Sequence, residues 1–325
     1  ELENKLYNFE KDLIKTKEEL KNIKASKITS WIQSYLNIVR MEEREKIYLE
    51  SVKKAEDNLE KVKKEKDIGE AGEQQLLTAK YSLKDSKYKL KEQRYNIDER
   101  KNSFKNELGL NSEKNIIFQT DNKLILELKE KINKLTEEYL NNEDLIKLVE
   151  KNNSSLQTNK IDRKILEREL NNLKKEDDLN IKIAGDYDTS SENLTATINF
   201  SYKLYDGGKH EIDLKSKKDS IKNNINNYEE KLKELKLNLE NHLNKLSLDK
   251  DKLDKEELNY QRNKNNLEIA KIKYDRGTID YLEYQDNWIT TRESGIKLKS
   301  IKDTIFINKL EFINFIKSEN VTGGF

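Results

Sequence analysis

Side chains that could do chemistry are few in this sequence. It has no cysteine, which excludes disulfides and thiolate metal sites. Its two histidines, His210 and His242, could in principle bind a metal or transfer protons, but each stands in a charged helical stretch without a nearby ligand partner. That setting favours a solvated histidine, or one that faces a seam between helices. The sequence also contains no nucleophile elbow, phosphate loop or metal-ligand cluster, so it predicts no enzyme, metal site or cofactor.

The composition favours long helices over one compact domain. Only 34% of the 325 residues are hydrophobic and 38% are charged, so the apolar side chains suffice for narrow seams rather than for a large core. The 63 lysines and arginines are interleaved with 62 aspartates and glutamates, which leaves no extended basic field for nucleic acid. Proline is absent, so no residue interrupts a helix by removing an amide donor. Periodic leucine, isoleucine and tyrosine residues argue against a disordered chain.

Two long stretches carry the apolar stripe of a coiled coil. Apolar residues recur there at spacings of three, four and seven, which keep one narrow stripe facing a partner helix. In residues 209–276 the stripe consists of Ile221, Ile225, Tyr228, Leu232, Leu235, Leu239, Leu246 and Leu253. In residues 1–66 it consists of Leu13, Leu20, Ile28, Trp31, Tyr35, Ile38, Leu49, Val52 and Leu59. Each stretch reaches on the order of 100 Å, because a helix rises about 1.5 Å per residue.

Each stretch meets a glycine and then continues into a second helix. The chain is expected to reverse at Gly69 and at Gly277, because glycine readily adopts the left-handed conformation that ends a helix. The sequence therefore predicts two helical hairpins. An offset of 208 residues, the separation of the two glycines, also aligns Leu6 with Leu214, Leu59 with Leu267 and Phe104 with Phe312. A repeat of this length indicates a duplicated unit.

The segment between the two copies is also expected to be mostly helical. One shorter helix is predicted from Lys123 to Leu140. Residues 141–144 have the composition of a capping segment, so helix is expected to restart there and to continue to Leu173.

Residues 179–205 alternate with a period of two and therefore predict a β-hairpin. On one face the first strand places Leu179, Ile181, Ile183, Gly185 and Tyr187. After a polar turn the second strand places Leu194, Ala196, Ile198, Phe200, Tyr202 and Leu204 on its apolar face. The strands have the length of membrane-spanning strands, but the alternation also fits a soluble hairpin that packs on helices. Because a lone two-stranded sheet is marginally stable, strands from other protomers are expected to complete a barrel.

Three motifs in order resemble the TolC family of outer-membrane efflux and secretion channels. The segment Ser201–Gly208 is similar to the family's exit from barrel to helix, with its aromatic-Leu-Phe-Asp-Gly-Gly pattern. Residues 270–277, followed by Thr278 to Asp286, resemble the tip of the family's second helical hairpin. Residues 312–324 resemble the closing helix and the Gly-Gly end. Because the three motifs lie on a duplicated coiled coil, the resemblance covers nearly the whole chain.

The resemblance implies a mainly α fold with a tubular assembly. Two long antiparallel coiled-coil hairpins form an α-helical tube, and one β-hairpin contributes to an intersubunit β-barrel. The implied segments are a first hairpin over 1–110, an equatorial segment and the helix that leads to the barrel over 111–178, the barrel strands over 179–205, and the second hairpin with the C-terminal end over 206–325. The family also implies a homotrimer whose tube lies in the periplasm below the outer membrane.

The resemblance assigns candidate site residues by position. The helix tips that dock a periplasmic adaptor are Gly69, Glu70, Ala71, Gly72, Gly277, Thr278, Ile279 and Asp280. The entrance gate and its acidic ring comprise Tyr274, Glu283 and Asp286. The lipid-facing strand residues are Ile181, Ile183, Tyr187, Ile198, Phe200 and Tyr202, and the turn from barrel to helix is Asp206, Gly207 and Gly208. The two carboxylates stand three residues apart on a helix, so they share a face that favours cations, although an ordinary solvated pair has the same spacing.

The match to the family is not complete. Ile279 stands where some members carry an arginine of the closed gate, and the prolines that often precede family strands are missing. Residue 1 aligns with Lys209, so the first repeat's strand pair either lies upstream or is not part of the protomer. The first twelve residues show no signal-peptide pattern.

The expected function is a passive conduit for drug efflux or type I protein secretion. Its expected partners are further copies of the chain, a periplasmic adaptor, an inner-membrane transporter and the lipid around the barrel, with no role for nucleic acid. Two alternatives remain open from the sequence. The same protomers could form a structural tube or surface scaffold that transports nothing, or the chain could be a soluble coiled-coil interaction rod.

Overall fold

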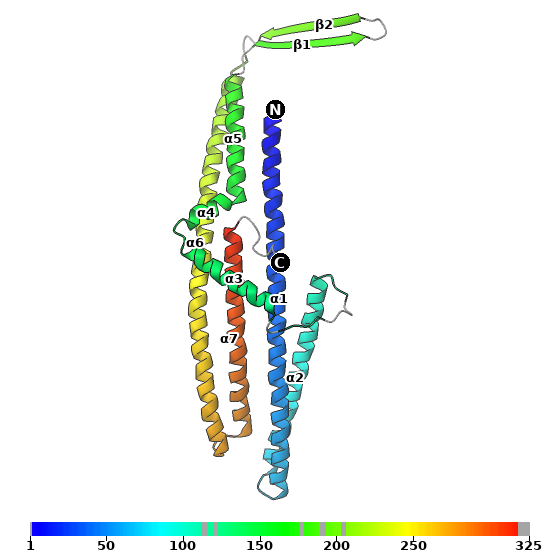
Figure 1. Ribbon diagram of the computed structural model, residues 1–325, viewed down its shortest axis with the longest axis vertical. Coiled ribbons are helices and arrows are strands. Elements are labelled where there is room, and N and C mark those ends of the chain that lie inside the picture. Colours follow the sequence, from blue (N-terminus) through cyan, green and yellow to red (C-terminus); the bar gives the residue numbers. More distant parts are fainter. Residues whose placement is uncertain are drawn as a thin grey trace. The chain divides into compact units, whose positions relative to one another are not determined.

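The computed structural model describes residues 2–111, 116–119, 122–175, 179–188, 193–202 and 206–317. The order of its elements is α1 (Leu2–Asp67), α2 (Glu73–Glu107), α3 (Lys123–Leu140), α4 (Leu145–Asn152), α5 (Ser154–Lys174), β1 (Leu179–Asp188), β2 (Asn193–Tyr202), α6 (Lys209–Asp275) and α7 (Tyr281–Ile316) (Figure 1). The predicted fold class, mainly α with one β-hairpin, is confirmed.

Both predicted chain reversals occur at their glycines. Gly69 has a φ of 83° and Gly277 a φ of 71°, the left-handed conformation that L residues with a Cβ rarely adopt. At the second reversal the amide of Thr278 donates to the carbonyl of Lys273 at 2.9 Å, and the amide of Gly277 donates to that of Tyr274 at 2.9 Å. These two bonds satisfy carbonyls that the end of α6 leaves free. The helix that precedes the glycine has 66 residues in the first hairpin (α1) and 67 in the second (α6).

The segment between the hairpins differs from expectation at one point. Helix does restart after residues 141–144, but it breaks again at Asn153, between α4 and α5. The side chain of Asn153 accepts a hydrogen bond from the amide of Leu156 at 2.9 Å and so caps α5. An asparagine that binds the backbone in this way competes with a continuous helix.

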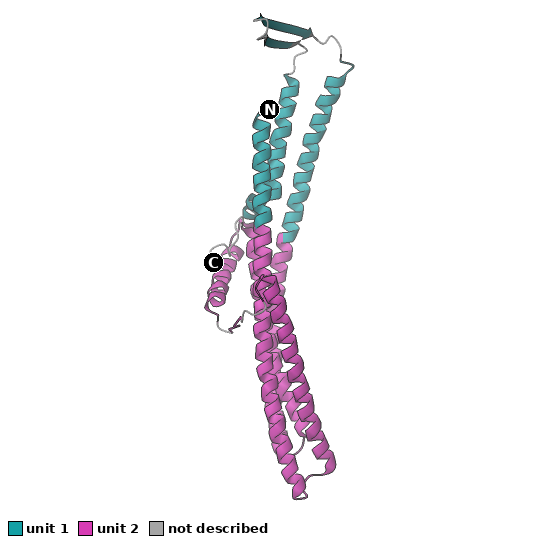
Figure 2. Cartoon of the chain, turned by 90° about the vertical axis from the view of Figure 1, so that its right-hand side faces the viewer, with its two compact units in different colours: residues 1–20, 146–238 teal, residues 21–145, 239–325 magenta. Residues whose placement is uncertain are grey.

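The chain divides into two compact units (Figure 2). Unit 1 consists of residues 1–20 and 146–238, and its interior is small, with Leu156 and Ile161 of α5 and Leu235 of α6 buried. Ion pairs complete the contacts inside it: Lys11 of α1 with Asp162 of α5, and Lys217 of α6 with Glu169 of α5, each at 2.7 Å.

Unit 2 consists of residues 21–145 and 239–325 and contains the larger core. Helix α3 packs against α7, where Ile132, Leu310 and Ile313 are fully buried. A second cluster joins Ile38 and Val39 of α1 to Phe104 of α2 and to Phe118. Together these clusters fix α3 and the residues around 118 against the helical hairpins.

Strands β1 and β2 pair in an antiparallel register. Ile181 lies opposite Phe200, Ile183 opposite Ile198, and Tyr187 opposite Leu194. Residues directly opposite in such a pair lie on the same face, so the predicted apolar positions form one face of the hairpin. Residues 203–205, which complete the predicted second strand, lie outside the described part of the chain. Among the described residues, no helix is long and apolar enough to cross a membrane.

Candidate channel-forming and docking sites

The two candidate docking tips are the reversals between α1 and α2 and between α6 and α7, and both belong to unit 2. The end of α6 contacts α1, because the hydroxyl of Tyr274 donates to Oδ1 of Asn58, which lies eleven residues before Gly69, at 3.5 Å. Nζ of Lys61 lies 5.7 Å from the centre of the Tyr274 ring. The end of α6 therefore packs against α1, and none of the described contacts joins residues 69–72 to residues 277–280.

A cluster of three tyrosines joins α6 to the start of α7. The ring of Tyr274 stacks on that of Tyr284, with centroids 5.0 Å apart, and meets that of Tyr281 edge to face at 6.0 Å. Burial raises the pKa of Tyr281, whose hydroxyl is buried without a hydrogen-bond partner. The sequence pointed to Tyr274 but missed the other two, although their spacing of three residues on one helix was visible.

The two candidate carboxylates of the acidic ring lie on the outside of unit 2. Glu283 and Asp286 are both exposed at the start of α7. The side chain of Asp280 caps this helix by accepting the amide of Glu283 at 2.8 Å. None of the described contacts joins Tyr274 to either carboxylate. The arrangement leaves both carboxylates free to face a pore or a partner.

A buried polar network lies further along the same hairpins. Nε2 of Gln285 on α7 donates to the hydroxyls of Ser51 on α1, at 2.9 Å, and of Ser86 on α2, at 3.0 Å. Its Oε1 accepts from Ser82 at 2.5 Å. All four side chains are buried. Because every polar atom of Gln285 has a partner, the network fixes how α7 is aligned with α1 and α2.

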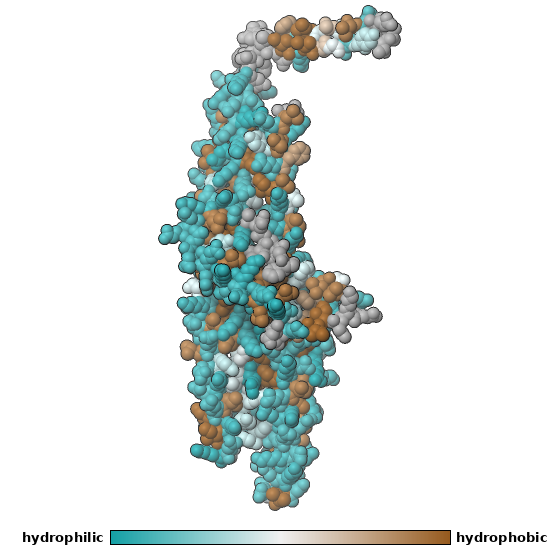
Figure 3. All heavy atoms as spheres, in the orientation of Figure 1, coloured by the Kyte–Doolittle hydropathy of each residue, from teal (hydrophilic) through white to brown (hydrophobic). Residues whose placement is uncertain are grey.

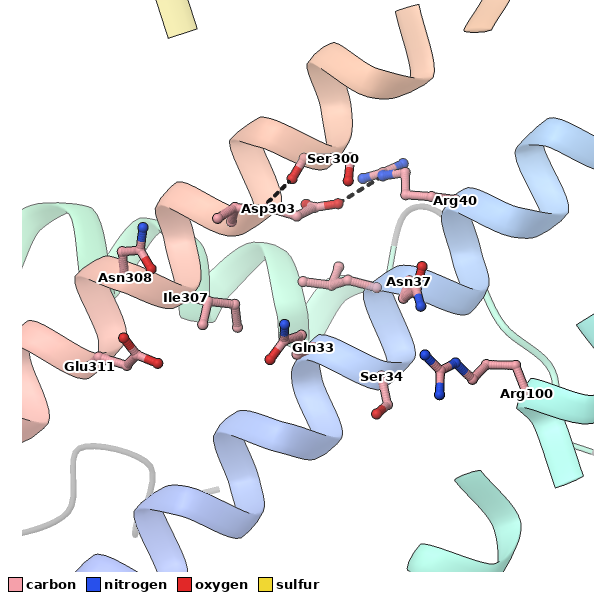
Figure 4. Close-up of a pocket in the computed structure, with 12 residues that line it drawn as sticks. Gln33, Ser34, Asn37, Arg40, Arg100, Ser300, Asp303, Ile307, Asn308 and Glu311 are labelled. Atoms are coloured by element: carbon pink, nitrogen blue, oxygen red, sulfur yellow. Dashed lines mark hydrogen bonds and ion pairs between the residues drawn. The ribbon is translucent and has the colours of Figure 1, made fainter. Parts of the chain in front are cut away.

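A charged cluster connects α1 and α7 to the N-terminal half of α3. Asp303 on α7 is buried and accepts Nζ of Lys129 at 2.7 Å. It also accepts Nε of Arg40 at 2.8 Å (Figure 4). Arg40 also donates to Glu43, which Lys299 contacts at 2.7 Å. Burial alone would lower the pKa of Arg40, but its hydrogen bonds to Asp303 and Glu43 outweigh burial and raise it.

A polar groove of about 420 Å³ lies beside this cluster, between α1 and α7. Its lining includes Gln33, Asn37, Arg100 and Glu311 (Figure 4). Ser34, Ser300 and Thr304 also line it, and none of the described hydrogen bonds joins one of their hydroxyls to a carboxylate or a histidine. Within the described ranges, no group of three or more His, Cys, Asp or Glu side chains is placed to hold a metal ion.

The β-hairpin presents its apolar face without cover from the described helices. Ile181, Ile183, Tyr187, Ile198 and Phe200 are between 51% and 75% exposed. Figure 3 shows hydrophobic residues on this hairpin and in separate patches among hydrophilic residues on the helices. The side chain of Tyr202 lies outside the described part of the structure. A hairpin with one exposed apolar face requires a partner or a lipid phase.

The turn after the hairpin begins α6. Gly207 and Gly208 have φ values of 69° and 79°, a succession of left-handed residues that favours glycine at both positions. The carboxylate of Asp206 accepts the amide of Gly208 at 2.8 Å and that of His210 at 2.6 Å. An aspartate that binds these amides stabilises the start of α6, where unpaired donors and the helix dipole favour a negative charge.

Comparison with solved structures shows the class of protein to which this fold corresponds. The structure resembles the outer membrane protein VceC from Vibrio cholerae, with a TM-score of 0.64, 12% identity, and coverage of 96% of this chain and 75% of VceC. It resembles CusC, with a TM-score of 0.69, 13% identity and coverage of 97% and 73%. It also resembles the MtrE outer membrane channel of Neisseria gonorrhoeae in its open state, with a TM-score of 0.64, 12% identity and coverage of 98% and 72%. The chain has the fold of TolC-like outer-membrane channels.

The sequence supports the same class. Residues 150–291 match the model of the family described as outer membrane efflux protein, a range that contains α5, the β-hairpin, α6 and the second tip. The resemblance to the TolC family that the motifs predicted is thereby confirmed. No curated protein matches the chain in sequence.

Proposed function

We propose that the chain is one protomer of an oligomeric outer-membrane channel and acts as a passive conduit for export. One observation is the main support for an oligomer. In residues 2–20 of α1, the stripe that faces outward is apolar and consists of Leu2, Leu6, Phe9, Leu13 and Leu20, each at least 52% exposed. The opposite, half-buried stripe inside unit 1 is mostly polar and consists of Asn4, Tyr7, Lys11, Ile14 and Glu18. A helix with its more apolar side outward requires a partner there, and further copies of the chain supply one.

The arrangement of unit 2 supports a closed ring rather than a dimer. Its long helices form a row in the order α6, α7, α1, α2 (Figure 1). Contacts join neighbours in this row, such as Asp249 of α6 with Asn308 of α7 and Lys87 of α2 with Glu56 of α1. The two ends of the row are different helices. Head-to-tail association of unlike ends produces a ring where the rotation between copies closes, and a ring of helices encloses a conduit.

The finer assignments follow from the resemblance and are part of the proposal. Three protomers form the tube, and the apolar face of the β-hairpin, including Ile181 and Phe200, contacts outer-membrane lipid in a barrel shared between protomers. The tips at Gly69–Gly72 and Gly277–Asp280 dock a periplasmic adaptor that links the channel to an inner-membrane transporter. Glu283 and Asp286, repeated by symmetry, form rings that favour cations, and Tyr274 belongs to the gate. The cargo is a small molecule in drug efflux or a protein in type I secretion.

The proposal is tested with the purified chain in detergent and in lipid nanodiscs. Electron microscopy should show rings in end view and tubes in side view, and planar bilayers should show stepwise ion conductance. A monodisperse monomer in light scattering, or rings that never conduct, would contradict the conduit. Rings whose hairpins remain in water when lipid is offered would instead support a scaffold.

A further inference from the structure

The seam between α6 and α7 contains a histidine that the proposed function does not use. The chain has two histidines, His210 and His242, and the sequence left open whether each is solvated or faces a seam. His242 faces a seam, because the centre of its ring lies 4.8 Å from that of Phe315 and 6.3 Å from that of Phe312, both on α7. It is therefore a titratable side chain in an aromatic contact between two helices of unit 2.

The residues around this contact belong to the core of unit 2. Phe312, Ile313 and Ile316 of α7 are fully buried. Helix α3 packs against the same helix, where its own Ile132 is fully buried. A change at His242 thus acts where the C-terminal end of α7 is held in the core.

The charged groups that act on the His242 imidazole are one from each helix of the seam. Lys245 follows it by three residues on α6, and Glu311 comes from α7; the two form an ion pair at 3.0 Å. None of the described hydrogen bonds or ion pairs involves the His242 side chain. Because Glu311 is paired with Lys245, the imidazole has no counter-charge of its own. Helix α1 lines the groove beside Phe315 with uncharged residues only: Asn22, Ala25, Ser26, Thr29, Ser30 and Gln33.

Protonation places a positive charge in this contact. A charged imidazole requires water or a counter-charge, whereas the seam offers two phenylalanine rings and the ammonium group of Lys245. Burial, followed by the charge of Lys245, lowers the pKa of His242, and the charge of Glu311 opposes these effects without cancelling them. A cation is also attracted to an aromatic ring, but phenylalanine provides less of this attraction than tryptophan does. The neutral imidazole therefore fits the seam better than the charged one.

We propose that His242 is an acid-sensitive contact, which holds α6 against the C-terminal end of α7 when neutral and releases it when protonated. The open seam binds the proton more tightly than the closed one. The contribution of His242 is therefore fully present above the pKa of histidine in an open chain, about 6.5, and is lost as the pH falls below it. The device lies within one protomer, so it does not depend on the proposed function.

The two histidines can be titrated separately by NMR in the full chain, with isotope-labelled histidine and detergent. The substitution His210→Gln identifies the imidazole signal that belongs to His242. We expect its midpoint below the usual value of about 6.5. Lys245→Gln, which removes a positive neighbour, should raise this midpoint. Lys252→Gln is the matched control and should not, because Lys252 is exposed, stands ten residues beyond His242 and takes part in none of the described ion pairs.

Hydrogen exchange followed by mass spectrometry shows whether protonation opens the seam. One proton taken up on opening weakens the closed state by at most about tenfold per pH unit. After correction for the intrinsic pH dependence of exchange, peptides from residues 309–316 should be about three- to tenfold less protected at about pH 5.5 than at about pH 7.5. Peptides from α2 should show no such loss.

Variants assign the response to the histidine. His242→Phe and His242→Gln cannot be protonated in this range, so both should abolish the loss of protection, and the use of two replacements guards against one that does not fold. His210→Gln is the matched control and should preserve the loss. Circular dichroism at about pH 7.5 verifies that each variant is helical.

Three results would overturn the proposal. They are a midpoint of His242 at or above about 6.5, equal protection of residues 309–316 at both pH values, and an acid response that persists in both folded His242 variants. None of these bears on the conduit, since rings and conductance are tested at neutral pH. Absent rings, in turn, leave the titration and the exchange experiment valid for the single protomer.

Discussion

The substitution Asp303→Asn tests how strongly one carboxylate holds α3 against α7. Asp303 accepts Nε of Arg40 at 2.8 Å and Nζ of Lys129 at 2.7 Å, and its side chain is 9% exposed. Asparagine keeps the size and one acceptor oxygen but removes the negative charge that Arg40 and Lys129 share. Losing one partner of a buried pair costs about 3–5 kcal/mol. Because Arg40 keeps Glu43 and the side chain of Lys129 is 25% exposed, we expect about 2 kcal/mol here.

Hydrogen exchange followed by mass spectrometry measures this loss locally. If the substitution lowers the free energy of opening α3 by about 2 kcal/mol, amides in peptides from Lys123–Leu140 should exchange about 30-fold faster. The matched control is Asp254→Asn on α6, because Asp254 is exposed and takes part in none of the described ion pairs. Unchanged exchange of α3 in a folded Asp303→Asn variant would refute the role given to this carboxylate. Equal acceleration in every helix would show a global rather than a local effect.

Three further predictions concern the tip, the pore and the assembly. Burial raises the pKa of Tyr281, so the folded tip keeps a proton that the unfolded chain loses near pH 10, and stability should fall above about pH 10. Tyr281→Phe should weaken that pH dependence in circular dichroism and stabilise the chain by about 1 kcal/mol, since it removes an unpartnered hydroxyl; an unchanged profile contradicts this. Replacing Glu283 and Asp286 with their amides should lower cation selectivity in reversal-potential measurements, and unchanged selectivity would place both carboxylates away from the pore. Leu6→Glu with Leu13→Glu should give helical monomers in light scattering, whereas intact oligomers would remove the outward stripe from the interface.

The features that the sequence predicted correctly depend on residues that lie close together in the sequence. Gly69 and Gly277 could be assigned to chain reversals because a left-handed helix end is a property of a few consecutive residues. The β-hairpin followed from alternation within residues 179–205. The helix break at Asn153 was also local, yet the prediction missed it, because the apolar spacing continues through the break and hides the capping asparagine.

The features that the sequence could not show depend on alignment between distant helices. Gln285 meets Ser51 across 234 positions of the chain, and Asp303 meets Arg40 across 263. Each residue, taken in its own helix, looks like an ordinary polar position in a chain that is 38% charged. Which helical turn faces which is decided by packing of the whole unit, so neither cluster was predictable from spacing.

The distribution of polar and apolar residues links folding of the protomer to its assembly. On α6, one heptad position facing α7 is occupied by His242, Asp249, Glu256 and Asn263. Asp249 and Glu256 are buried there, bonded to Asn308 and Lys297 of α7. Polar residues in such a seam fix its register but add little stability. On α1, by contrast, the apolar stripe that includes Leu6 and Leu13 faces away from unit 1. The polar seam thus sets the alignment of α6 with α7, and in the proposed assembly further copies of the chain would bury the outward stripe of α1.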